Sequence, residues 1–168
     1  ALNNPLAQWT VEKIWNFPLG AVNLKSDIGT FLARCYLCGK GSYPNSAGVH
    51  ETNGANSWAI WTAERVGDKV ALKGDNGKYL SRCNNCWLAG TTGGADSAFV
   101  QVSTPAGNPW AQWTPEDLGS GKWALKGDTG KYLARCSNCV TGGAVANFAF
   151  VNGLTSTNSL SQWTVTRR

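Results

Sequence analysis

The chain has 168 residues, of which 42% are hydrophobic and 15% are charged. This length suffices for one domain with a core of its own, and the composition excludes an intrinsically disordered chain. The formal net charge is +5, but the Lys and Arg residues are scattered, with no run longer than Arg167–Arg168, so the charge predicts no specific nucleic-acid site. No apolar run approaches the roughly 20 residues needed to span a bilayer.

Residues 1–15 predict an extra strand-like segment ahead of the main fold. From Trp9 to Lys13 every second residue alternates with Thr or Glu, a pattern typical of a half-buried strand. Pro18 and Gly20 then interrupt the pattern. The chain starts Ala-Leu-Asn-Asn without Met, so we expect that at least the first residue has been removed, and the removal of a whole leader stays open.

A sixteen-residue stretch then recurs three times. Each copy predicts a strand, a tight turn built on Asp-x-Gly, and a returning strand that ends in Cys-x-x-Cys. Glycine supplies the positive φ that such a turn requires, and the Asp side chain caps its own backbone. The copies read NLKSDIGTFLARCYLC at 23–38, ALKGDNGKYLSRCNNC at 71–86 and ALKGDTGKYLARCSNC at 124–139.

The segments after each Cys pair are also repeated. A loop rich in Gly, Ser, Thr and Asn leads into a short strand, which we predict at 49–52, 98–102 and 148–151. A second polar loop then leads to a closing motif that ends in Trp-Thr. This closing motif occurs four times, as PLAQWT at 5–10, SWAIWT at 57–62, PWAQWT at 109–114 and SLSQWT at 159–164.

The pattern predicts one all-β domain over residues 1–168, built from three repeats with four short strands each. We expect a β-trefoil, in which a six-stranded barrel is capped by three hairpins, because a propeller needs at least four blades and a solenoid leaves atypical end units. The closing motifs at Trp9 and Trp163 compete for one slot, so we expect residues 1–15 to add a strand or to pair with a second molecule in a swapped homodimer. The predicted repeats are about 21–66, 69–118 and 122–168.

The hairpin motif Leu-Lys-Ser/Gly-Asp-x-Gly-Lys/Thr-Tyr/Phe-Leu, with a distant strand and Gln-Trp-Thr, resembles the fascin-like branch of the β-trefoils over essentially the whole chain. The opening NPLAQWTVE is also similar to a strand end of amaranthin-type plant lectins. The first resemblance implies actin binding or crosslinking, and the second implies binding of galactose or N-acetylgalactosamine glycans; other trefoils inhibit proteases. Ricin-type lectins carry Gln-x-Trp, whereas Gln and Trp are adjacent here, which argues against a ricin-type sugar site. One fold hosts all these activities, so the site residues must decide between them.

All six cysteines lie in Cys-x-x-Cys pairs, one at the same place in each repeat. Disulfides within the pairs would each contribute at most about 2 kcal/mol, and they indicate an oxidising compartment and hence a secreted or extracellular protein. Three alternatives stay open: a Cys₄ zinc site, which would leave one pair unmatched; a redox motif, which normally precedes a helix; and reduced thiols in a cytoplasmic protein. The predicted disulfide residues are Cys35, Cys38, Cys83, Cys86, Cys136 and Cys139.

Enzymatic activity is not expected. The single histidine, His50, has no Ser or Cys motif beside it, and the adjacent Glu51 should point to the opposite face of the strand. Asp27, Asp75 and Asp128 hold equivalent turn positions, so they should lie far apart rather than pair for acid–base chemistry. The sequence therefore predicts no catalytic residue, no metal and no other cofactor.

Carbohydrate binding is the function that the loops favour, with the glycan of a glycoprotein or polysaccharide as partner and shallow sites after the Cys pairs. Sugars need an aromatic face for their C–H groups and polar groups for their hydroxyls. The loops offer both, although loop Asn often serves turns and Trp87 could instead pack on a hairpin. The candidate carbohydrate-binding residues are Tyr36, Asn84, Asn85, Trp87, Asn108, Trp110 and Asn138.

Binding to actin or another protein is the alternative. Two sets of basic residues recur at equivalent positions and would form a threefold basic surface for acidic actin, unless their stems cover the hairpin aromatics while the charges stay in water. Protease inhibition through an exposed loop is a third hypothesis, with no sequence feature in its favour. The basic sets are Arg34, Arg82 and Arg135, and Lys25, Lys73 and Lys126.

Overall fold

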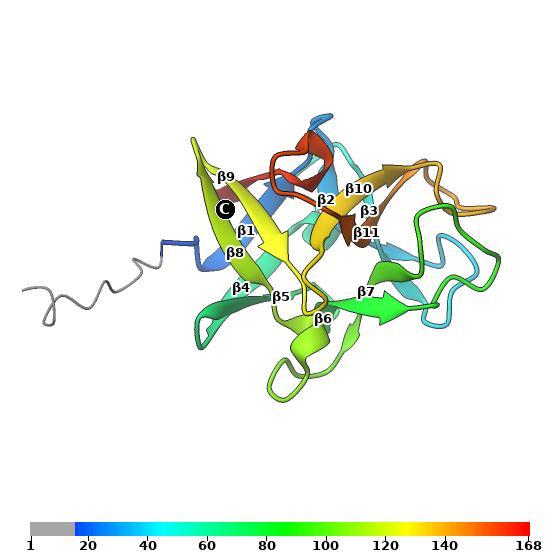
Figure 1. Cartoon of the computed structure of the whole chain (residues 1–168), viewed down its shortest axis with the longest axis horizontal. Helices are drawn as coiled ribbons and strands as arrows, with labels where there is room; N and C mark the ends of the chain where they lie inside the picture. Colours follow the sequence, from blue (N-terminus) through cyan, green and yellow to red (C-terminus); the bar gives the residue numbers. More distant parts are fainter. Residues whose placement is uncertain (1–15) are drawn as a thin grey trace, which may run out of the picture.

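The structure is a computed structural model that describes residues 16–168 (Figure 1). These residues contain twelve strands and three single-turn 3₁₀ helices. We call β1–β4 the first unit, β5–β8 the second and β9–β12 the third. The strands are β1 Gly20–Lys25, β2 Phe31–Tyr36, β3 Asn45–Glu51, β4 Trp61–Val66, β5 Lys69–Lys73, β6 Tyr79–Asn84, β7 Asp96–Val102, β8 Thr114–Gly119, β9 Lys122–Lys126, β10 Tyr132–Ser137, β11 Asn147–Gly153 and β12 Trp163–Arg167, and the helices are η1 Ser57–Ala59, η2 Pro109–Ala111 and η3 Ser159–Ser161.

Six strands, the first and fourth of each unit, close into a barrel. Antiparallel pairing runs from β5 through β4, β1, β12 and β9 to β8. The barrel closes where Val70 and Trp113 exchange backbone hydrogen bonds, each 2.8 Å long. Closure removes the unpaired edges that an open sheet would expose.

The second and third strands of each unit form three hairpins that cap the barrel. The hairpins are β2–β3, β6–β7 and β10–β11, and their third strands contact one another in a ring. The contacts pair Ser46 with Phe99, Ser97 with Phe150, and Phe148 with Gly48. This arrangement confirms the predicted all-β trefoil.

The Asp-x-Gly turns, which connect β1 to β2, β5 to β6 and β9 to β10, adopt the predicted geometry. The glycine of each Asp-x-Gly turn has a positive φ, at +88° for Gly29, +78° for Gly77 and +86° for Gly130. A residue with a Cβ is strained there, which is why all three copies keep Gly.

The closing motifs contribute a fully buried tryptophan to each unit. A buried indole N–H needs a hydrogen-bond acceptor, and here each Nε1 donates to the carbonyl oxygen of a leucine on the second strand of the same unit. This bond ties the last strand of a unit to its hairpin. The pairs are Trp61 with Leu32 (2.9 Å), Trp113 with Leu80 (3.1 Å) and Trp163 with Leu133 (3.0 Å), and all three indoles are 0% exposed.

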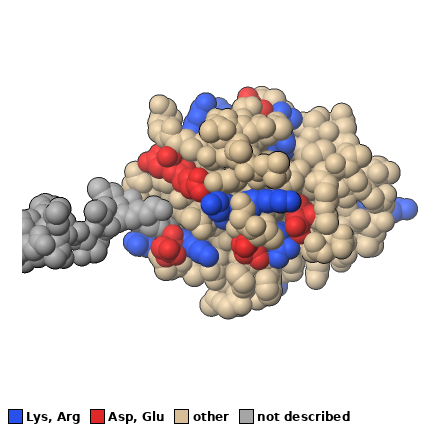
Figure 2. All heavy atoms as spheres, in the orientation of Figure 1, with Lys and Arg blue, Asp and Glu red and all other residues tan. Residues whose placement is uncertain are grey.

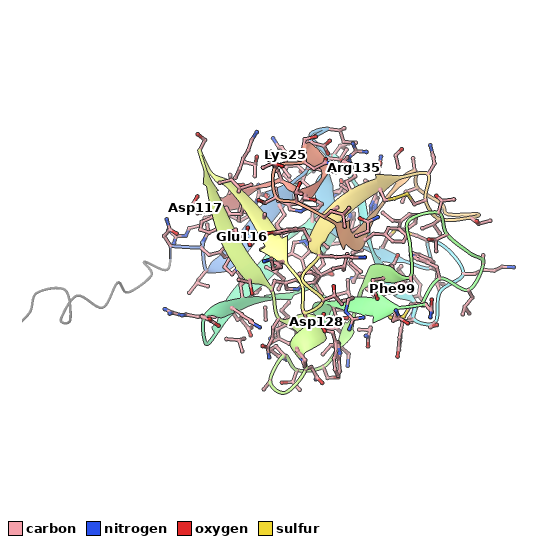
Figure 3. The ribbon with its side chains drawn as sticks, viewed as in Figure 1. Lys25, Phe99, Glu116, Asp117, Asp128 and Arg135 are labelled. Atoms are coloured by element: carbon pink, nitrogen blue, oxygen red, sulfur yellow. A yellow bond between two sulfur atoms is a disulfide. The ribbon has the colours of Figure 1, made fainter. Side chains whose placement is uncertain are left out.

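The closing motif at the C-terminus occupies the slot beside the first unit, because β12 carries Trp163 and pairs with β1. The described chain begins beside β8 and β9, where the second and third units adjoin. Asn16 donates to Asp117, and Phe17 packs on Trp123 with 5.0 Å between ring centroids (Figure 3). The predictions for residues 1–15, an extra strand or a swapped homodimer, lie outside the described residues.

Two local predictions were wrong. The third strands begin earlier than expected, at Asn45, Asp96 and Asn147, because these residues continue the pairing with the second strand. The three closing motifs within residues 16–168 begin with one-turn helices where none was predicted. An asparagine precedes every one of these helices, namely Asn56, Asn108 and Asn158.

Among residues 16–168 we find no helix with the length and apolar character that crossing a bilayer requires.

Candidate functional site

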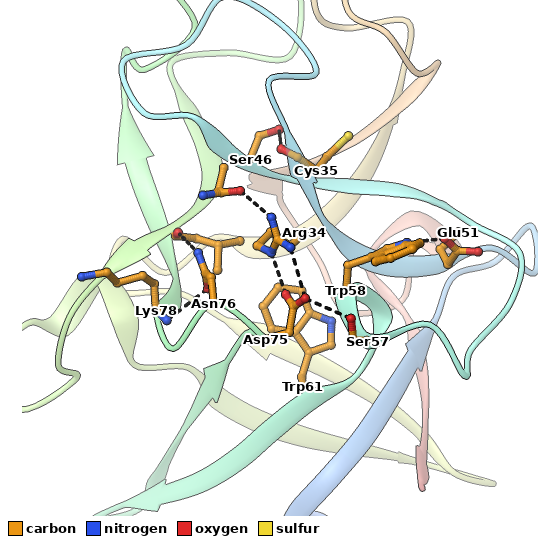
Figure 4. A network of polar contacts seen from close by, with 12 residues as sticks. Arg34, Cys35, Ser46, Glu51, Ser57, Trp58, Trp61, Asp75, Asn76 and Lys78 are labelled. Atoms are coloured by element: carbon orange, nitrogen blue, oxygen red, sulfur yellow. Dashed lines mark hydrogen bonds and ion pairs between the residues drawn. The ribbon is translucent and has the colours of Figure 1, made fainter.

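Three Arg–Asp ion pairs connect the units in a closed ring, which we call the Arg–Asp ring. Each arginine lies on the second strand of one unit, and its Nε and Nη2 donate to both carboxylate oxygens of the turn Asp in the next unit, as Figure 4 shows for Arg34 and Asp75. Its Nη1 donates to the first residue of its own third strand. The pairs, with their Nε–Oδ1 distances, are Arg34–Asp75 (2.6 Å), Arg82–Asp128 (2.7 Å) and Arg135–Asp27 (2.7 Å).

The three arginines of the Arg–Asp ring are the ones that the actin hypothesis required to be exposed and unpaired. Its six side chains are only 11–21% exposed. Hydrogen bonds from the arginines lower the pKa of Asp27, Asp75 and Asp128, so these carboxylates stay ionised and paired. A threefold basic surface built on the arginines is therefore wrong, because each guanidinium binds a carboxylate.

The equivalent lysines lie over the hairpin aromatics, which confirms the alternative interpretation for them. Each ammonium lies 5.4–5.7 Å from a ring centroid, a cation–π distance. In the second unit the Tyr79 hydroxyl also donates a hydrogen bond to Glu64. Burial is the main cause, and this hydrogen bond the second, that raises the pKa of Tyr79 to about 12. The pairs are Lys25 with Phe31, Lys73 with Tyr79 and Lys126 with Tyr132.

The loops after the Cys pairs hold one another in a second ring. We call residues 37–44, 85–95 and 138–146 the cap loops; they gather at one end of the molecule (Figure 1), and that end is largely uncharged on the face drawn in Figure 2. In each cap loop a backbone N–H donates to the carbonyl of the second cysteine of another unit. The bonds are Ser42 to Cys86 (2.7 Å), Thr92 to Cys139 (2.8 Å) and Ala144 to Cys38 (2.6 Å).

All three Cys-x-x-Cys pairs form disulfides, as predicted. They join Cys35 to Cys38, Cys83 to Cys86 and Cys136 to Cys139. The zinc and free-thiol alternatives are wrong, because no thiolate remains to bind a metal. Within residues 16–168, no three or more His, Cys, Asp or Glu side chains are grouped to hold a metal ion. Disulfides are consistent with an extracellular protein.

Trp87 belongs to the core rather than to a sugar site. Its side chain is 7% exposed and packs between Phe99 and Phe148, with 4.8 and 5.0 Å between ring centroids. Together with the buried Cys83 and Cys86 these rings form an apolar cluster under the cap loops. The prediction of carbohydrate binding by Trp87 is wrong, because the side chain is buried and leaves no ring surface for a sugar.

Two of the predicted asparagines hold loop structure through their side chains. Asn84 Nδ2 donates to Asp96 Oδ1 at 2.9 Å, and Asn108 Nδ2 donates to the carbonyl oxygen of Thr104 at 2.8 Å. Asn108 also precedes η2. The Asn108 amide serves a turn, which was the alternative interpretation for loop asparagine, whereas the Asn84 amide bonds across the end of the β6–β7 strand pair.

The other two predicted asparagines occupy a strained backbone position, the third residue of Cys-x-x-Cys. Asn85 and Asn138 have φ of 56° and 57°, in the left-handed region that Asn tolerates better than most residues. The equivalent residue in the first unit is Leu37, with φ of 55° and a 63% exposed side chain. The strain is therefore greatest in the first unit.

We expect Leu37→Asn to raise the free energy of unfolding by about 1 kcal/mol, because it relieves most of the left-handed penalty and removes an exposed apolar side chain. Chemical denaturation measures the change, and Asn85→Leu is the matched reverse substitution, which should lower stability by a similar amount. A Leu37→Asn protein that is less stable than the parent would contradict the prediction.

A pocket of about 310 Å³ lies between the first disulfide and η1. We call it the first-unit pocket. The exposed Tyr36 and Trp58, at 63% and 38%, are its aromatic members. Its full lining is Arg34, Cys35, Tyr36, Cys38, His50, Glu51 and Trp58.

A carboxylate holds Trp58 in place in this pocket. The Trp58 Nε1 donates to Glu51 Oε2, and the backbone N–H of Asn53 donates to Glu51 Oε1 at 2.9 Å (Figure 4). Burial would raise the pKa of Glu51, but these hydrogen bonds outweigh it and the pKa is lowered. Glu51 is therefore ionised at neutral pH, and it fixes an indole that remains partly exposed.

His50 adds a neutral polar group. Its Nδ1 is buried and has no hydrogen-bond partner among the described residues, and a Cβ at Gly48 would collide with it. Burial lowers the pKa of His50, and the nearby Glu51 opposes this effect only in part. A neutral imidazole carries one donor and one acceptor, so it can either donate a hydrogen bond to a hydroxyl group or accept one from it.

The equivalent places in the other units lack this combination. The hairpin registers align the units, since Arg34, Arg82 and Arg135 each face an alanine. The second unit keeps an indole but has no carboxylate to hold it, and the third unit has neither. The positions of Tyr36, His50, Glu51 and Trp58 carry Asn84, Gln101, Val102 and Trp110 in the second unit and Ser137, Asn152, Gly153 and Leu160 in the third.

The sequence predicted Tyr36 as a binding residue of this pocket but did not predict Trp58, His50 or Glu51. Trp58 could have been found, because SWAIWT and PWAQWT place Trp58 and the selected Trp110 at the same position. Trp110 is indeed 38% exposed. The roles of His50 and Glu51 had no signal in the sequence, because they depend on the end of β3 meeting η1.

No protein-family model matches the chain, and no curated protein matches it in sequence. Solved structures match it in fold. A Polyporus squamosus lectin bound to the epitope Neu5Acα2-6Galβ1-4GlcNAc aligns with a TM-score of 0.65 and 16% identity, over 90% of this chain and 50% of the lectin chain. The designed threefold-symmetric protein ThreeFoil aligns with a TM-score of 0.65 and 18% identity, over 89% of this chain and 99% of its own.

An exo-β-1,3-galactanase from Clostridium thermocellum also aligns, with a TM-score of 0.65 and 14% identity, over 90% of this chain and 31% of the enzyme. At such low identities the likeness shows the fold alone. None of these comparisons identifies the fascin-like or amaranthin-like family. The function therefore has to be argued from the pocket.

Proposed function

We propose that the chain is a non-enzymatic carbohydrate-binding protein and that the first-unit pocket is its binding site. The observation that carries the proposal is the partly exposed Trp58 ring, held by the ionised Glu51. A pyranose presents a face of C–H groups, which suits an aromatic ring, and a rim of hydroxyls, which need donors and acceptors. The pocket volume of about 310 Å³ suits one sugar ring, at the lower end of small-ligand sites.

The polar groups of the pocket have capacity for ligand hydroxyls. The Glu51 carboxylate accepts hydrogen bonds from Asn53, Trp58 and Asn56, and a carboxylate offers roughly four lone-pair positions. The Tyr36 hydroxyl belongs to a 63% exposed side chain. Neutral His50 offers a donor or an acceptor. This mixture of one aromatic surface with a few convergent polar groups supports a small neutral ligand.

Binding without catalysis is part of the proposal. Cys35 and Cys38, which line the pocket with His50, are joined in a disulfide, so neither supplies a thiolate nucleophile. Hydrolysis of a glycosidic bond generally uses two carboxyl groups on either side of the bond. The lining of the first-unit pocket includes a single carboxylate, Glu51.

The place of action also belongs to the proposal. We propose a secreted protein whose partner is the glycan of a glycoprotein or polysaccharide. The three disulfides support an oxidising compartment. The lectin and the galactanase among the structural neighbours support a glycan ligand in general terms.

Trp58→Ala is expected to weaken glycan binding at least tenfold, because it removes the aromatic surface of the pocket and leaves Glu51 without its indole partner. Binding to a glycan array, competed by the free sugar, identifies the ligand, and calorimetric titration then compares the variants. Trp110→Ala is the matched control, since Trp110 is equally exposed at the equivalent position of the second unit. Equal binding by both variants, or weaker binding by Trp110→Ala, would contradict the assignment to the first unit.

A further inference from the structure

A second pocket lies at the equivalent place in the third unit, between the third disulfide and η3. We call it the third-unit pocket. Its volume is about 590 Å³, against about 310 Å³ for the first-unit pocket. Gly153 and Leu160 stand in this lining where the first unit has the larger Glu51 and Trp58. This pocket can therefore hold a sugar ring together with a substituent.

A buried serine without a hydrogen-bond partner lies at the base of this pocket. Ser161 is 1% exposed and belongs to the pocket lining, and its Oγ has no partner among the described residues. A Cβ at Gly153 would collide with this Oγ, so the hydroxyl fills space that only a glycine leaves free. The two positions therefore depend on each other.

The fold does not require this serine. Ala59 and Ala111 hold the equivalent position in the other units, and both are 0% exposed. A buried hydroxyl without a partner lowers stability relative to alanine. The third unit thus carries a polar group that packing does not explain. Turning the Ser161 side chain toward a ligand would break no hydrogen bond, because it makes none.

Most of the other groups around the third-unit pocket are apolar or already hydrogen-bonded, and the hydroxyl of Ser137 lies at its exposed rim. Leu154 and Leu160 are 78% and 37% exposed, and the disulfide of Cys136 and Cys139 forms another part of the lining. Asn152 Nδ2 donates to the carbonyl oxygen of Gly93 at 2.9 Å. Arg135 is bound to Asp27 and Asn147 in the Arg–Asp ring. The pocket therefore offers no free charge, and it favours a neutral group with an apolar part and one acceptor.

We propose that the third-unit pocket binds an acetyl group carried by a sugar, on nitrogen or on oxygen. The methyl group contacts Leu154, Leu160 and the disulfide, and the carbonyl oxygen accepts a hydrogen bond from Ser161 Oγ. An acetyl group combines the two features that the pocket requires, a compact apolar end and a single uncharged acceptor. This site is separate from the first-unit pocket and does not depend on the proposal made for it.

The test is a two-dimensional ¹⁵N–¹H NMR titration of the full chain with three probes: methyl N-acetylglucosaminide, methyl 6-O-acetylglucoside and methyl glucoside. We expect saturable shifts at the amides of Gly153, Leu154 and Ser161 with one or both acetylated probes and none with methyl glucoside. Which of the two acetylated probes shifts these amide signals distinguishes an N-acetyl ligand from an O-acetyl ligand. Equal shifts with all three probes, or no shift with either acetylated probe, would overturn the proposal.

Two variants separate binding from folding. Ser161→Ala should bind the acetylated probe about fivefold more weakly, the effect of one neutral hydrogen bond, while its melting temperature stays equal or rises. The double variant Gly153→Val with Ser161→Ala copies the Val102 and Ala111 of the second unit, and it should abolish the shifts in a folded protein. Unchanged affinity in Ser161→Ala refutes the role of the hydroxyl. Signals near Trp58 report on the first-unit pocket independently, so failure at one site is distinguishable from failure at the other.

Discussion

Reduction of the three disulfides is expected to remove most of the stability of the protein. Each disulfide closes a very short loop and contributes about 2 kcal/mol in the chain-entropy account, so three together approach the total of about 5–15 kcal/mol for a domain. The effect extends beyond each loop, because the carbonyls of Cys38, Cys86 and Cys139 accept the hydrogen bonds that join the cap loops. Urea unfolding with and without a phosphine reductant measures the loss.

The disulfides should also differ in their resistance to reduction. Cys83 and Cys86 are both 6% exposed and lie in the apolar cluster with Trp87, whereas Cys38 and Cys136 are only half-buried. Mass spectrometry after alkylation at increasing reductant should find the pair of Cys83 and Cys86 reduced last. The double substitution of Cys83 and Cys86 by alanine should be more destabilising than the same change at Cys35 and Cys38. Unchanged stability after verified reduction would refute a structural role for the disulfides.

Arg82→Ala is expected to lower the free energy of unfolding by about 3 kcal/mol, because it leaves the carboxylates of Asp128 and Asp96 without their partner in a largely buried place. Arg82 and Asp128 are 18% and 17% exposed, so solvent screens the pair far less than a surface ion pair. A double-mutant cycle with Asp128→Ala should yield a coupling free energy of about 1–3 kcal/mol. Lys131→Ala changes an exposed residue in the same turn as Asp128 and is the control. Its free energy of unfolding should differ from that of the parent by no more than about 0.5 kcal/mol.

Acid unfolding should reveal the same pair. The hydrogen bond from Arg82 lowers the pKa of Asp128 in the folded state, while the unfolded chain keeps the ordinary value of 3.8. The stabilisation is therefore complete above that value and is lost as the pH falls through the lower folded pKa. The free energy of unfolding of the parent protein should decrease below about pH 5. Arg82→Ala should decrease less steeply, and parallel curves would contradict the prediction.

The pattern of local interactions was predictable because it repeats within short stretches. Asp-x-Gly turns need glycine wherever they occur, so their hairpins could be predicted from three copies of one motif. The tryptophans of the closing motifs recur at a fixed distance from the hairpins, and large apolar residues at such positions form cores. The Cys-x-x-Cys disulfides could be predicted because each cysteine has its partner three residues away, although zinc, redox and free-thiol alternatives stayed open.

The candidate site was only partly predictable, because its contacts join segments that the sequence does not place together. Arg135 binds Asp27, which lies 108 positions away in the chain. Because this pair and its two equivalents neutralise the arginines, the expected basic surface does not form. Trp87 was expected to contact sugars, but the neighbouring units supply Phe148 to cover it. Trp58 became the candidate platform because the end of β3 brings Glu51 to its indole N–H.

The sequence by itself determined the three four-stranded units and the turns and favoured the disulfides, since each rests on residues close together in the chain. Only the tertiary structure decided which polar groups are free to bind a ligand. The ring arginines bind aspartates of neighbouring units, and the Trp87 indole is buried, so none of these groups is free. Differences between equivalent positions place a carboxylate, Glu51, in the first-unit pocket and a buried serine, Ser161, in the third-unit pocket. Equivalent sequences therefore form equivalent scaffolds, and both proposed binding sites depend on side chains in which the units differ.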